Sequence, residues 1–232
     1  MTADPSLVEE LGRHNTPTVL NGLKRIGVQP RDFETMSRHA VQCMSPSLGP
    51  RVGFAATRKV WTARNGPSGV DRKVSAQAME ESLLQLPGPR FLVAENVGEW
   101  QGPVCIWGEI VANHSVAMGC VGGITNGPVR DIDEMEAAGF LTFAAGADVG
   151  GGFVENVGFA EPVEIGGVVV RHGDLLHGDR HGVVKVPAER LAQLVDSIAA
   201  VQDHERAVVE LCRSDRFTPE AFREAMNRGL RG

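Results

Sequence analysis

The chain has 232 residues, of which 42% are hydrophobic and 22% charged, so it is long enough to bury a full hydrophobic core. A formal net charge of -6 provides no global positive field, which argues against a nucleic-acid partner and favours small-molecule chemistry. The four cysteines lie far apart without a CxxC pair, so we expect reduced thiols rather than a zinc site or a disulfide framework. We find no signal sequence and no apolar run of membrane-spanning length, and we expect a cytoplasmic protein without a membrane partner.

The first part of the chain predicts helices and strands in turn. In TPTVLNGLKRIG, Thr16 is the expected N-cap, Pro17 takes the first helical position, and apolar residues at helical spacing precede Gly27. The pattern then predicts a strand over residues 52–57, a loop over 63–71, a helix over 76–86 and a strand over 90–96.

The central part predicts a βαβ unit. A helix over residues 108–119 leads into a buried strand over 120–125, a helix over 131–139 and a second buried strand over 140–145. Because such crossovers join parallel strands with a right-handed connection, we expect the two strands to be parallel. A glycine-rich loop follows over residues 146–158.

The last part predicts two more strands and then helices. The strands lie over residues 162–170 and 182–187, a long helix begins at Pro187 and runs towards Cys212, and a capped helix covers 218–229. Since neither a repeat nor a linker divides the chain, we expect one α/β domain over residues 1–232, with a helical segment from about 187 to 232.

The connection between those two strands, RHGDLLHGDRHG at residues 171–182, concentrates three histidines and two aspartates. One interpretation is a metal site. However, metal ligands must point at one centre, whereas Gly173, Gly178 and Gly182 predict tight turns that aim neighbouring side chains apart. Aspartate after glycine is also a common turn former. We therefore favour a structural turn module over a metal site.

A second group of polar residues lies earlier in the chain. Glu109 begins a helix and, after twenty intervening residues, Arg130 and Asp131 stand where a strand ends and the next helix begins. Ligands bind at such places in α/β sheets. Arginine offers a planar fork to a carboxylate, aspartate offers a hard oxygen to Mg²⁺ or Mn²⁺, and a second carboxylate can move a proton. From spacing alone, the alternative of a capping pair with a favourable helix-dipole charge stays open.

These residues also resemble a known family. GE, twenty residues and RD, followed by GGVVVRHGDLLHGDRHGVVKVP, is similar to the RraA-like family, which includes the class II 4-hydroxy-4-methyl-2-oxoglutarate/4-carboxy-4-hydroxy-2-oxoadipate aldolases. TPTVLNGLKRIG resembles the family's N-terminal helix, and VGFAAT its first core strand. The family's aldolases carry the Arg-Asp pair and its ribonuclease E regulators lack the Asp, so Asp131 groups this chain with the enzymes. Two positions depart from the family pattern, where Glu109 and Asn21 replace the more usual aspartates.

The resemblance implies a swivelling β/β/α fold, assembled as a homotrimer or homohexamer with active sites between protomers. It implies a metal-dependent lyase that cleaves 4-hydroxy-2-oxo acids to pyruvate and a second carbonyl compound, with oxaloacetate decarboxylation as a side activity. It also implies that the metal binds at the Arg-Asp site and that the segment at residues 171–182 is a structural turn.

Cleavage of such an acid passes through the pyruvate enolate, whose negative charge needs a fixed positive partner. This mechanism assigns a role to each site residue. Asp131 would hold Mg²⁺ or Mn²⁺, Arg130 would bind the 2-oxo acid, and Glu109 would position water and transfer protons. Backbone N–H groups at the start of the helix would add donors. These belong to Gly108, Glu109, Ile110, Val111 and Ala112.

Two competing hypotheses stay open. A lysine Schiff base would cleave the same bond, and only Lys185, in the apolar VVKVP, is a candidate for it, although we expect its ammonium at the surface. The alternative function is that of a non-catalytic binding protein resembling the ribonuclease E regulators.

Overall fold

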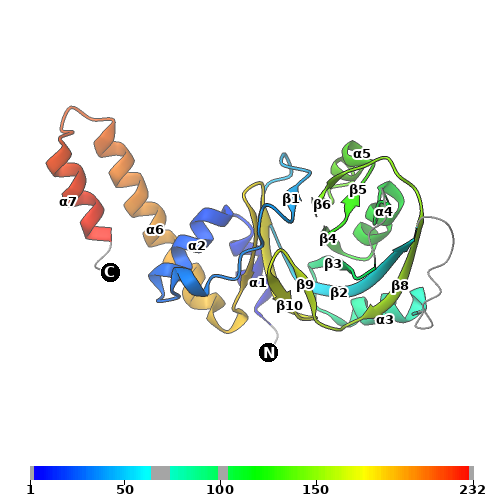
Figure 1. The fold of residues 1–232 in the computed structure, drawn as a ribbon. Helices are drawn as coiled ribbons and strands as arrows, with labels where there is room; N and C mark the ends of the chain where they lie inside the picture. The colour runs from blue at the N-terminus through cyan, green and yellow to red at the C-terminus, as the bar shows by residue number, and fades with distance from the viewer. Residues whose placement is uncertain (1–2, 64–73, 99–103, 230–232) are drawn as a thin grey trace.

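A computed structural model describes residues 3–63, 74–98 and 104–229 (Figure 1). The helices are α1 (Pro5–Leu11), α2 (Thr16–Arg25), α3 (Ala76–Gln85), α4 (Glu109–Ala117), α5 (Ile132–Ala137), α6 (Leu191–Cys212) and α7 (Pro219–Gly229), with 3-10 turns η1 (Pro30–Asp32) and η2 (Ala188–Arg190). The strands are β1 (Gln42–Cys43), β2 (Arg51–Ala63), β3 (Arg90–Asn96), β4 (Cys120–Thr125), β5 (Pro128–Val129), β6 (Leu141–Ala144), β7 (Gly146–Ala147), β8 (Phe153–Phe159), β9 (Val163–Ile165), β10 (Val168–Val170), β11 (Leu175–Asp179) and β12 (Gly182–Val186).

In the described part of the chain, the main sheet has eight strands: β1, β6, β4, β3, β2, β11 and β12 in this order, with β8 also paired to β2. β3 runs parallel to β2 and β4, and β4 runs parallel to β6, which confirms the predicted βαβ unit. The long strand β2 pairs antiparallel with β11 through its first residues and with β8 from Arg58 onward. β2 thereby bends the sheet into a barrel-like shape (Figure 1).

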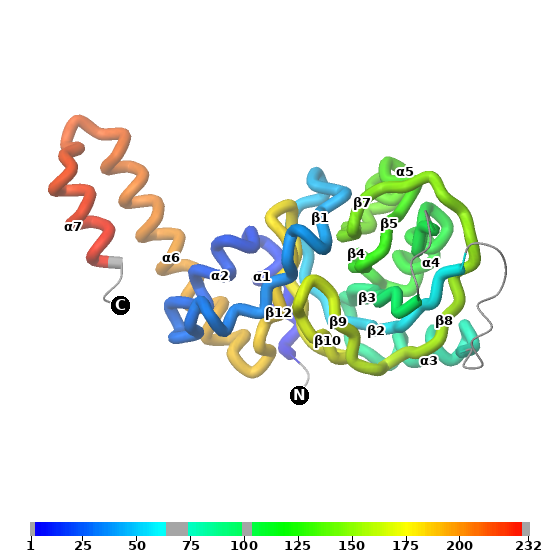
Figure 2. Tube along the Cα trace, viewed as in Figure 1, coloured from blue at the N-terminus to red at the C-terminus, as the bar shows by residue number. Residues whose placement is uncertain are grey.

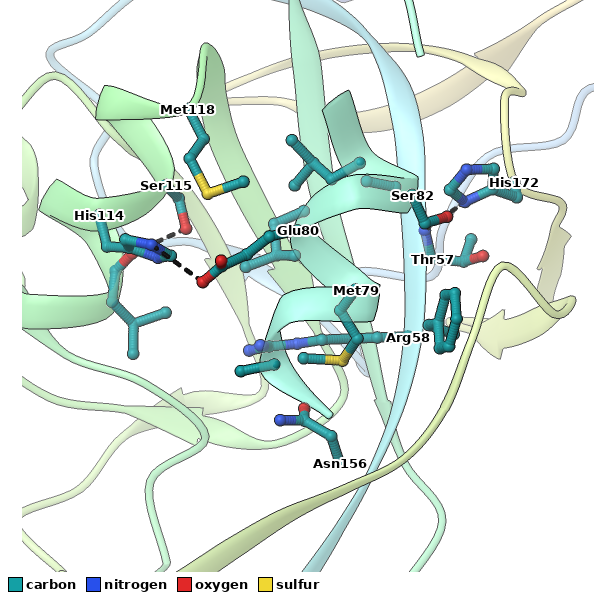
Figure 3. A pocket seen from close by; sticks show the side chains of 16 residues that line it. Thr57, Arg58, Met79, Glu80, Ser82, His114, Ser115, Met118, Asn156 and His172 are labelled. Atoms are coloured by element: carbon teal, nitrogen blue, oxygen red, sulfur yellow. Dashed lines mark hydrogen bonds and ion pairs between the residues drawn. The ribbon is translucent and has the colours of Figure 1, made fainter. Parts of the chain in front are cut away.

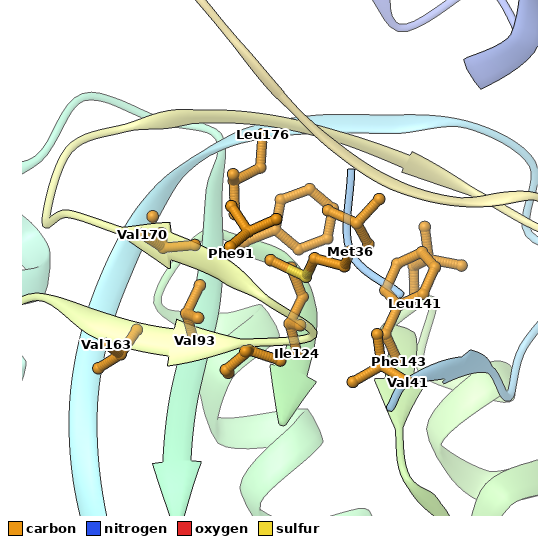
Figure 4. Packing of buried hydrophobic residues seen from close by; sticks show 14 residues of the cluster. Met36, Val41, Phe91, Val93, Ile124, Leu141, Phe143, Val163, Val170 and Leu176 are labelled. Carbon is orange, nitrogen blue, oxygen red and sulfur yellow. The ribbon is translucent and has the colours of Figure 1, made fainter. Parts of the chain in front are cut away.

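Three groups of buried side chains hold the sheet and its covering elements together. Figure 4 shows the first, in which Val163 and Val170 of the β9–β10 hairpin lie beside Phe91 and Val93 of β3. The second fills the space between the sheet and the α4–α5 layer and includes Trp107. The third joins α1, α2 and α6 to β2, β11 and β12. Figure 2 shows these N-terminal helices beside α6.

The C-terminal helices α6 and α7 form a hairpin that projects away from the sheet (Figure 1). Within the described ranges, none of the helices has both the length and the apolar composition needed to cross a bilayer.

The N-terminal region differs from the prediction in two respects. Asn15, not Thr16, is the N-cap of α2, because its side chain accepts the N–H of Thr18 at 2.9 Å. The preceding residues form α1, which the sequence pattern did not predict. The strand predicted over residues 52–57 is the first part of β2, which continues to Ala63; the rest of the loop predicted over 63–71 lies outside the described residues.

The C-terminal half of the sheet holds three further corrections. The strand predicted over residues 162–170 is the hairpin β9–β10, because Gly166 and Gly167 adopt positive φ angles of 61° and 81° and reverse the chain. The predicted glycine-rich loop contains β7 and all but one residue of β8. The predicted turn module at residues 171–182 is wrong in its centre, where β11 lies between β2 and β12.

Candidate active site

Two segments far apart in the sequence bring the predicted site residues together. The N–H of Ile106 donates to the carbonyl of Pro128 at 2.8 Å, and the N–H of Arg130 donates to the carbonyl of Trp107 at 3.2 Å. The chain that leads into α4 therefore lies against the chain that leads into α5. As a result, Glu109 at the start of α4 and the Arg130–Asp131 pair meet at one place.

Asp131 is held in an unusual backbone conformation. Its φ of 55° and ψ of 48° lie in the left-handed region, which costs a non-glycine residue on the order of 1–3 kcal/mol. The side chain does not cap its own helix, α5. Instead, Oδ2 accepts the N–H of Glu109 at 3.1 Å and lies 3.5 Å from Nε of Arg130. The capping alternative thus holds only in part, because this carboxylate caps α4 and remains partly exposed.

Gly108 allows this close approach. A Cβ atom at position 108 would overlap the carboxylate of Asp131 and lie 3.0 Å from Cγ of Arg130. Gly108 is also the N-cap of α4, with extended backbone angles of -149° and -155°. The glycine therefore serves the contact between the two segments rather than a positive φ angle.

The site opens into two adjoining hollows. The first has a volume of about 470 Å³ and is bounded by the start of α4, the Arg130–Asp131 pair and residues 150–152. The second, of about 700 Å³, lies between Arg130–Asp131 and the loop at Asp148. Because both hollows share Arg130 and Asp131, a small organic acid can contact both side chains at once.

The first turn of α4 supplies part of the expected backbone donors. The N–H of Glu109 donates to Asp131, and the N–H of Ala112 donates to the carbonyl of Gly108 at 3.1 Å. Ala112 is also fully buried, so it is not available to a ligand, contrary to the prediction. Within the described part of the chain, the N–H groups of Ile110 and Val111 have no acceptor, as expected for a helix N-terminus.

The residues at this site fit a lightly held hard cation. No group of three His, Cys, Asp or Glu side chains in the described ranges is arranged to hold a metal ion. However, Mg²⁺ usually keeps several water ligands and binds proteins through one or two carboxylates. Asp131 offers one partly exposed carboxylate at the edge of an open cavity, and this donor set suits such an ion better than zinc.

The glycine-rich loop predicted over residues 146–158, for which the sequence left open a wall of the site or a plain connection, lines both hollows. Asp148 accepts the N–H groups of Val149 and Gly150 at 2.7 and 3.3 Å, which fixes the turn that carries residues 150–152. The thiol of Cys105 donates to the carbonyl of Asp148 at 3.2 Å, and burial raises the pKa of Cys105. The Asp-Val-Gly-Gly-Gly run in the sequence indicates this turn, because a short acidic residue before glycines is typical of such turns.

The histidine-rich segment lies in another part of the fold and supports the core. His177 is fully buried: its Nε2 donates to the carbonyl of His14 at 2.9 Å, and its Nδ1 accepts the hydroxyl of Thr16 at 3.1 Å. Asp179 accepts the N–H groups of Thr16 and His181 at 2.9 and 2.8 Å. These contacts bind α2 to β11, so the segment acts in folding, although through a buried strand rather than turns alone.

The ammonium of Lys185, the candidate for a Schiff base, pairs with two carboxylates. Its Nζ lies 2.6 Å from Oε1 of Glu34 and 3.4 Å from Oδ2 of Asp174. It lines a hollow with Phe33 and Arg190 rather than either hollow at Arg130–Asp131. This position does not favour the Schiff-base route.

Comparison with known proteins places the chain in a family. The family model described as RraA-like, Aldolase/RraA, matches residues 16–185. A Halalkalibacterium halodurans protein named as a 4-hydroxy-4-methyl-2-oxoglutarate aldolase is 32% identical over 163 residues, which cover 67% of this chain and 77% of that protein. Protein MJ0644 of Methanocaldococcus jannaschii is 31% identical over 122 residues, 52% of this chain. That match spans 59% of MJ0644, and a match to Legionella pneumophila DlpA spans 19% of that relative.

The fold has a counterpart among solved structures. Streptomyces coelicolor RraAS2, described as an unusual member of the RNase ES inhibitor RraA protein family, superposes with a TM-score of 0.66 and 22% identity, covering 92% of this chain and 98% of that one. At that identity the likeness concerns the fold alone. The family match covers most of the chain, and the mixed α/β architecture agrees with it. The chain therefore belongs to the RraA-like family, which includes both aldolases and RraA inhibitors.

Proposed function

We propose that the protein is a divalent-metal-dependent aldolase that cleaves 4-hydroxy-2-oxo acids of the 4-hydroxy-4-methyl-2-oxoglutarate type to pyruvate and a second carbonyl compound. One observation carries the proposal: the carboxylate of Asp131 lies against the N-terminus of α4, 3.5 Å from Nε of Arg130, at the edge of an open cavity. The family membership and the named aldolase relative support the same reaction class.

Substrate binding falls to Arg130 and the helix N-terminus. The Arg130 side chain is half-exposed, so its guanidinium can pair with the carboxylate of a 2-oxo acid through two parallel hydrogen bonds. The N–H groups of Ile110 and Val111 face the N-terminal end of α4, where partial positive charge accumulates. They can donate to the oxygen on which negative charge develops as the carbon–carbon bond breaks.

Proton transfer falls to Glu109. Its side chain lies in the first turn of α4 and lines the same cavity as Arg130. Glu109 would accept the proton of the substrate's 4-hydroxyl while the C3–C4 bond breaks, which leaves the new carbonyl compound and the pyruvate enolate. Return of that proton to C3 completes pyruvate, so atoms and charge balance. Mg²⁺ or Mn²⁺ held by Asp131 would supply Lewis acidity beside the enolate.

Pyruvate release from 4-hydroxy-4-methyl-2-oxoglutarate tests the proposal. The assay couples pyruvate to lactate dehydrogenase and compares metal-loaded protein with protein treated with EDTA. We expect turnover with Mg²⁺ or Mn²⁺, loss of turnover with EDTA and recovery when the metal is restored. Oxaloacetate should also lose carbon dioxide, because its decarboxylation passes through the same enolate. Inactivity towards all 2-oxo acids, together with tight binding to ribonuclease E, would favour the regulator function instead.

A further inference from the structure

A second, smaller cavity lies beside the later turns of α4. It has a volume of about 190 Å³ and is lined mainly by α3, α4, β2 and β8 (Figure 3). Most of its wall is apolar, including Met79, Leu83, Leu92, Met118 and Phe159. Neither Arg130 nor Asp131 lines it, and Val111 of α4 is the one described residue that it shares with the first hollow of the candidate active site.

Arg58 brings a positive charge into this apolar cavity. In Figure 3 its side chain extends past Met79, with Asn156 below it in this view. Nε is completely covered by neighbouring atoms and has no hydrogen-bond partner, and no ion pair or side-chain hydrogen bond of Arg58 occurs in the described ranges. Burial lowers the pKa of Arg58 to about 10, so the guanidinium is still charged at neutral pH.

Among the described residues, the acidic groups around Arg58 do not neutralise it. Cys120 is its electrostatic neighbour, but burial raises the pKa of that thiol to about 11, which keeps it uncharged at neutral pH. The carboxylate of Glu80, at the rim of the cavity, is engaged instead by Nε2 of His114 at 3.3 Å (Figure 3). His172 has a lowered pKa caused mainly by burial, so it adds no positive charge of its own.

The guanidinium is held in place by a rigid aromatic support. It lies 5.7 Å from the ring centre of Trp107, and Trp107 in turn meets Phe140 edge to face with ring centres 6.3 Å apart. A cation–π contact offsets part of the cost of this partly buried charge, but it gives the N–H donors no acceptor among the described residues. An arginine whose Nε is covered and which has no carboxylate partner in the described ranges is costly to the folded state, and an anionic ligand would reduce that cost.

We propose that this cavity is a binding site for a short-chain monocarboxylate, whose carboxylate pairs with Arg58. The planar guanidinium matches a carboxylate in geometry, and the apolar walls suit a short hydrocarbon tail better than a phosphate ion, which has no apolar part. The volume suits an acid of a few carbons. The side-chain amide of Asn156, which has no partner in the described part of the chain, can donate a further hydrogen bond.

Isothermal titration calorimetry with butyrate tests the site directly. The wild-type protein should bind one butyrate per chain at pH 7 and bind inorganic phosphate far more weakly. Arg58→Met should weaken butyrate binding by about tenfold or more, the effect of losing one charge-assisted hydrogen bond. Arg58→Lys, which keeps the charge but not the fork, should also bind more weakly and covers the case in which Arg58→Met does not fold.

Two controls locate the binding. Lys59→Gln removes a neighbouring charge on β2 that pairs with Glu161 and does not line the cavity, so butyrate binding should be unchanged. Arg130→Gln should leave it unchanged as well. Absence of saturable butyrate binding, loss of binding in Arg130→Gln but not in the Arg58 variants, or tighter binding of phosphate than of butyrate would each overturn the proposal. So would a lower unfolding temperature of Arg58→Met with unchanged butyrate binding, which would assign Arg58 to packing against Trp107.

Discussion

Arg130 has two neighbours that limit what can replace it. Its Nε lies 3.5 Å from Asp131, and its backbone N–H is bonded to Trp107, so the guanidinium is positioned at the edge of the cavity. A lysine keeps the charge but not the planar fork. We expect Arg130→Lys to lower kcat/KM for pyruvate release by about thirty- to a thousand-fold, equivalent to roughly 2 to 4 kcal/mol of transition-state stabilisation. A change of less than twofold in the coupled assay would mean that Arg130 does not bind the substrate.

His177 makes the stability of the fold depend on pH. Burial is the main reason that its pKa falls from 6.5 to about 4 in the folded protein. Between these two values the unfolded chain takes up a proton that the folded protein does not, so acidification favours unfolding. Because one pKa unit is worth about 1.4 kcal/mol, His177 should lower the free energy of unfolding by about 3 kcal/mol between pH 7 and pH 4.

The measurement is urea unfolding of the wild type and of His177→Gln across that pH range. Carboxylates titrate in the same range in both proteins, so the informative quantity is the difference between their unfolding free energies. We expect the advantage of the wild type to shrink as the pH falls. A difference that does not vary with pH would contradict the role of burial at His177.

The strands β4 and β6 pack too closely for a side chain at Gly122. A Cβ atom there would overlap the backbone carbonyl of Leu141 and lie 2.8 Å from the ring of Phe91. Since a backbone atom cannot move aside cheaply, Gly122→Ala should lower the free energy of unfolding by about 1 to 3 kcal/mol. Gly158→Ala on β8 is the control, because its added Cβ meets no atom closer than 3.4 Å. Equal unfolding midpoints for the two variants would show that the contact between β4 and β6 adapts.

The sequence predicted helices and strands correctly where apolar residues recur with a regular period. It predicted them less well where pairing with distant strands determines the structure. The helix and strand on either side of Cys120 and the parallel βαβ unit followed from local pattern. By contrast, β11 lies in a segment rich in Gly, His and Asp. These residues predicted turns, and the short apolar pair Leu175–Leu176 was not enough to predict a strand. Its strand conformation comes from pairing with β2 and β12, which are distant partners that no local window contains.

The site was partly predictable for a similar reason. Glu109, Arg130 and Asp131 stand at helix starts, so their approach followed from the expected topology. The left-handed conformation of Asp131 and the contact that it makes with α4 did not, because they depend on a tertiary approach that Gly108 permits. Arg58 follows the strand predicted over residues 52–57, and its cavity was not predictable because α3, α4 and β8 come to it from distant parts of the chain.

At the level of the whole molecule, we propose assembly into a homotrimer or homohexamer with the active sites between protomers. Ile110 and Val149, which lie beside the two hollows of the site, are 84% and 91% exposed in the single chain, an unusual cost for apolar side chains unless a second copy covers them. Light scattering should give three or six times the chain mass of 24.8 kDa. Ile110→Lys should shift the mass towards one chain, and a monomeric wild type would contradict the assembly.

A Mg²⁺ titration of pyruvate release tests the proposal that Asp131 provides the metal dependence of catalysis. Asp131→Asn is the sharpest variant, because asparagine tolerates the left-handed conformation and its side-chain oxygen can still accept the N–H of Glu109. We predict that the wild type shows saturable activation by Mg²⁺ and that the variant folds with a similar unfolding temperature but loses turnover by about 10²-fold or more at every Mg²⁺ concentration. Mg²⁺ activation and turnover of Asp131→Asn at wild-type levels would show that Asp131 does not provide the metal dependence.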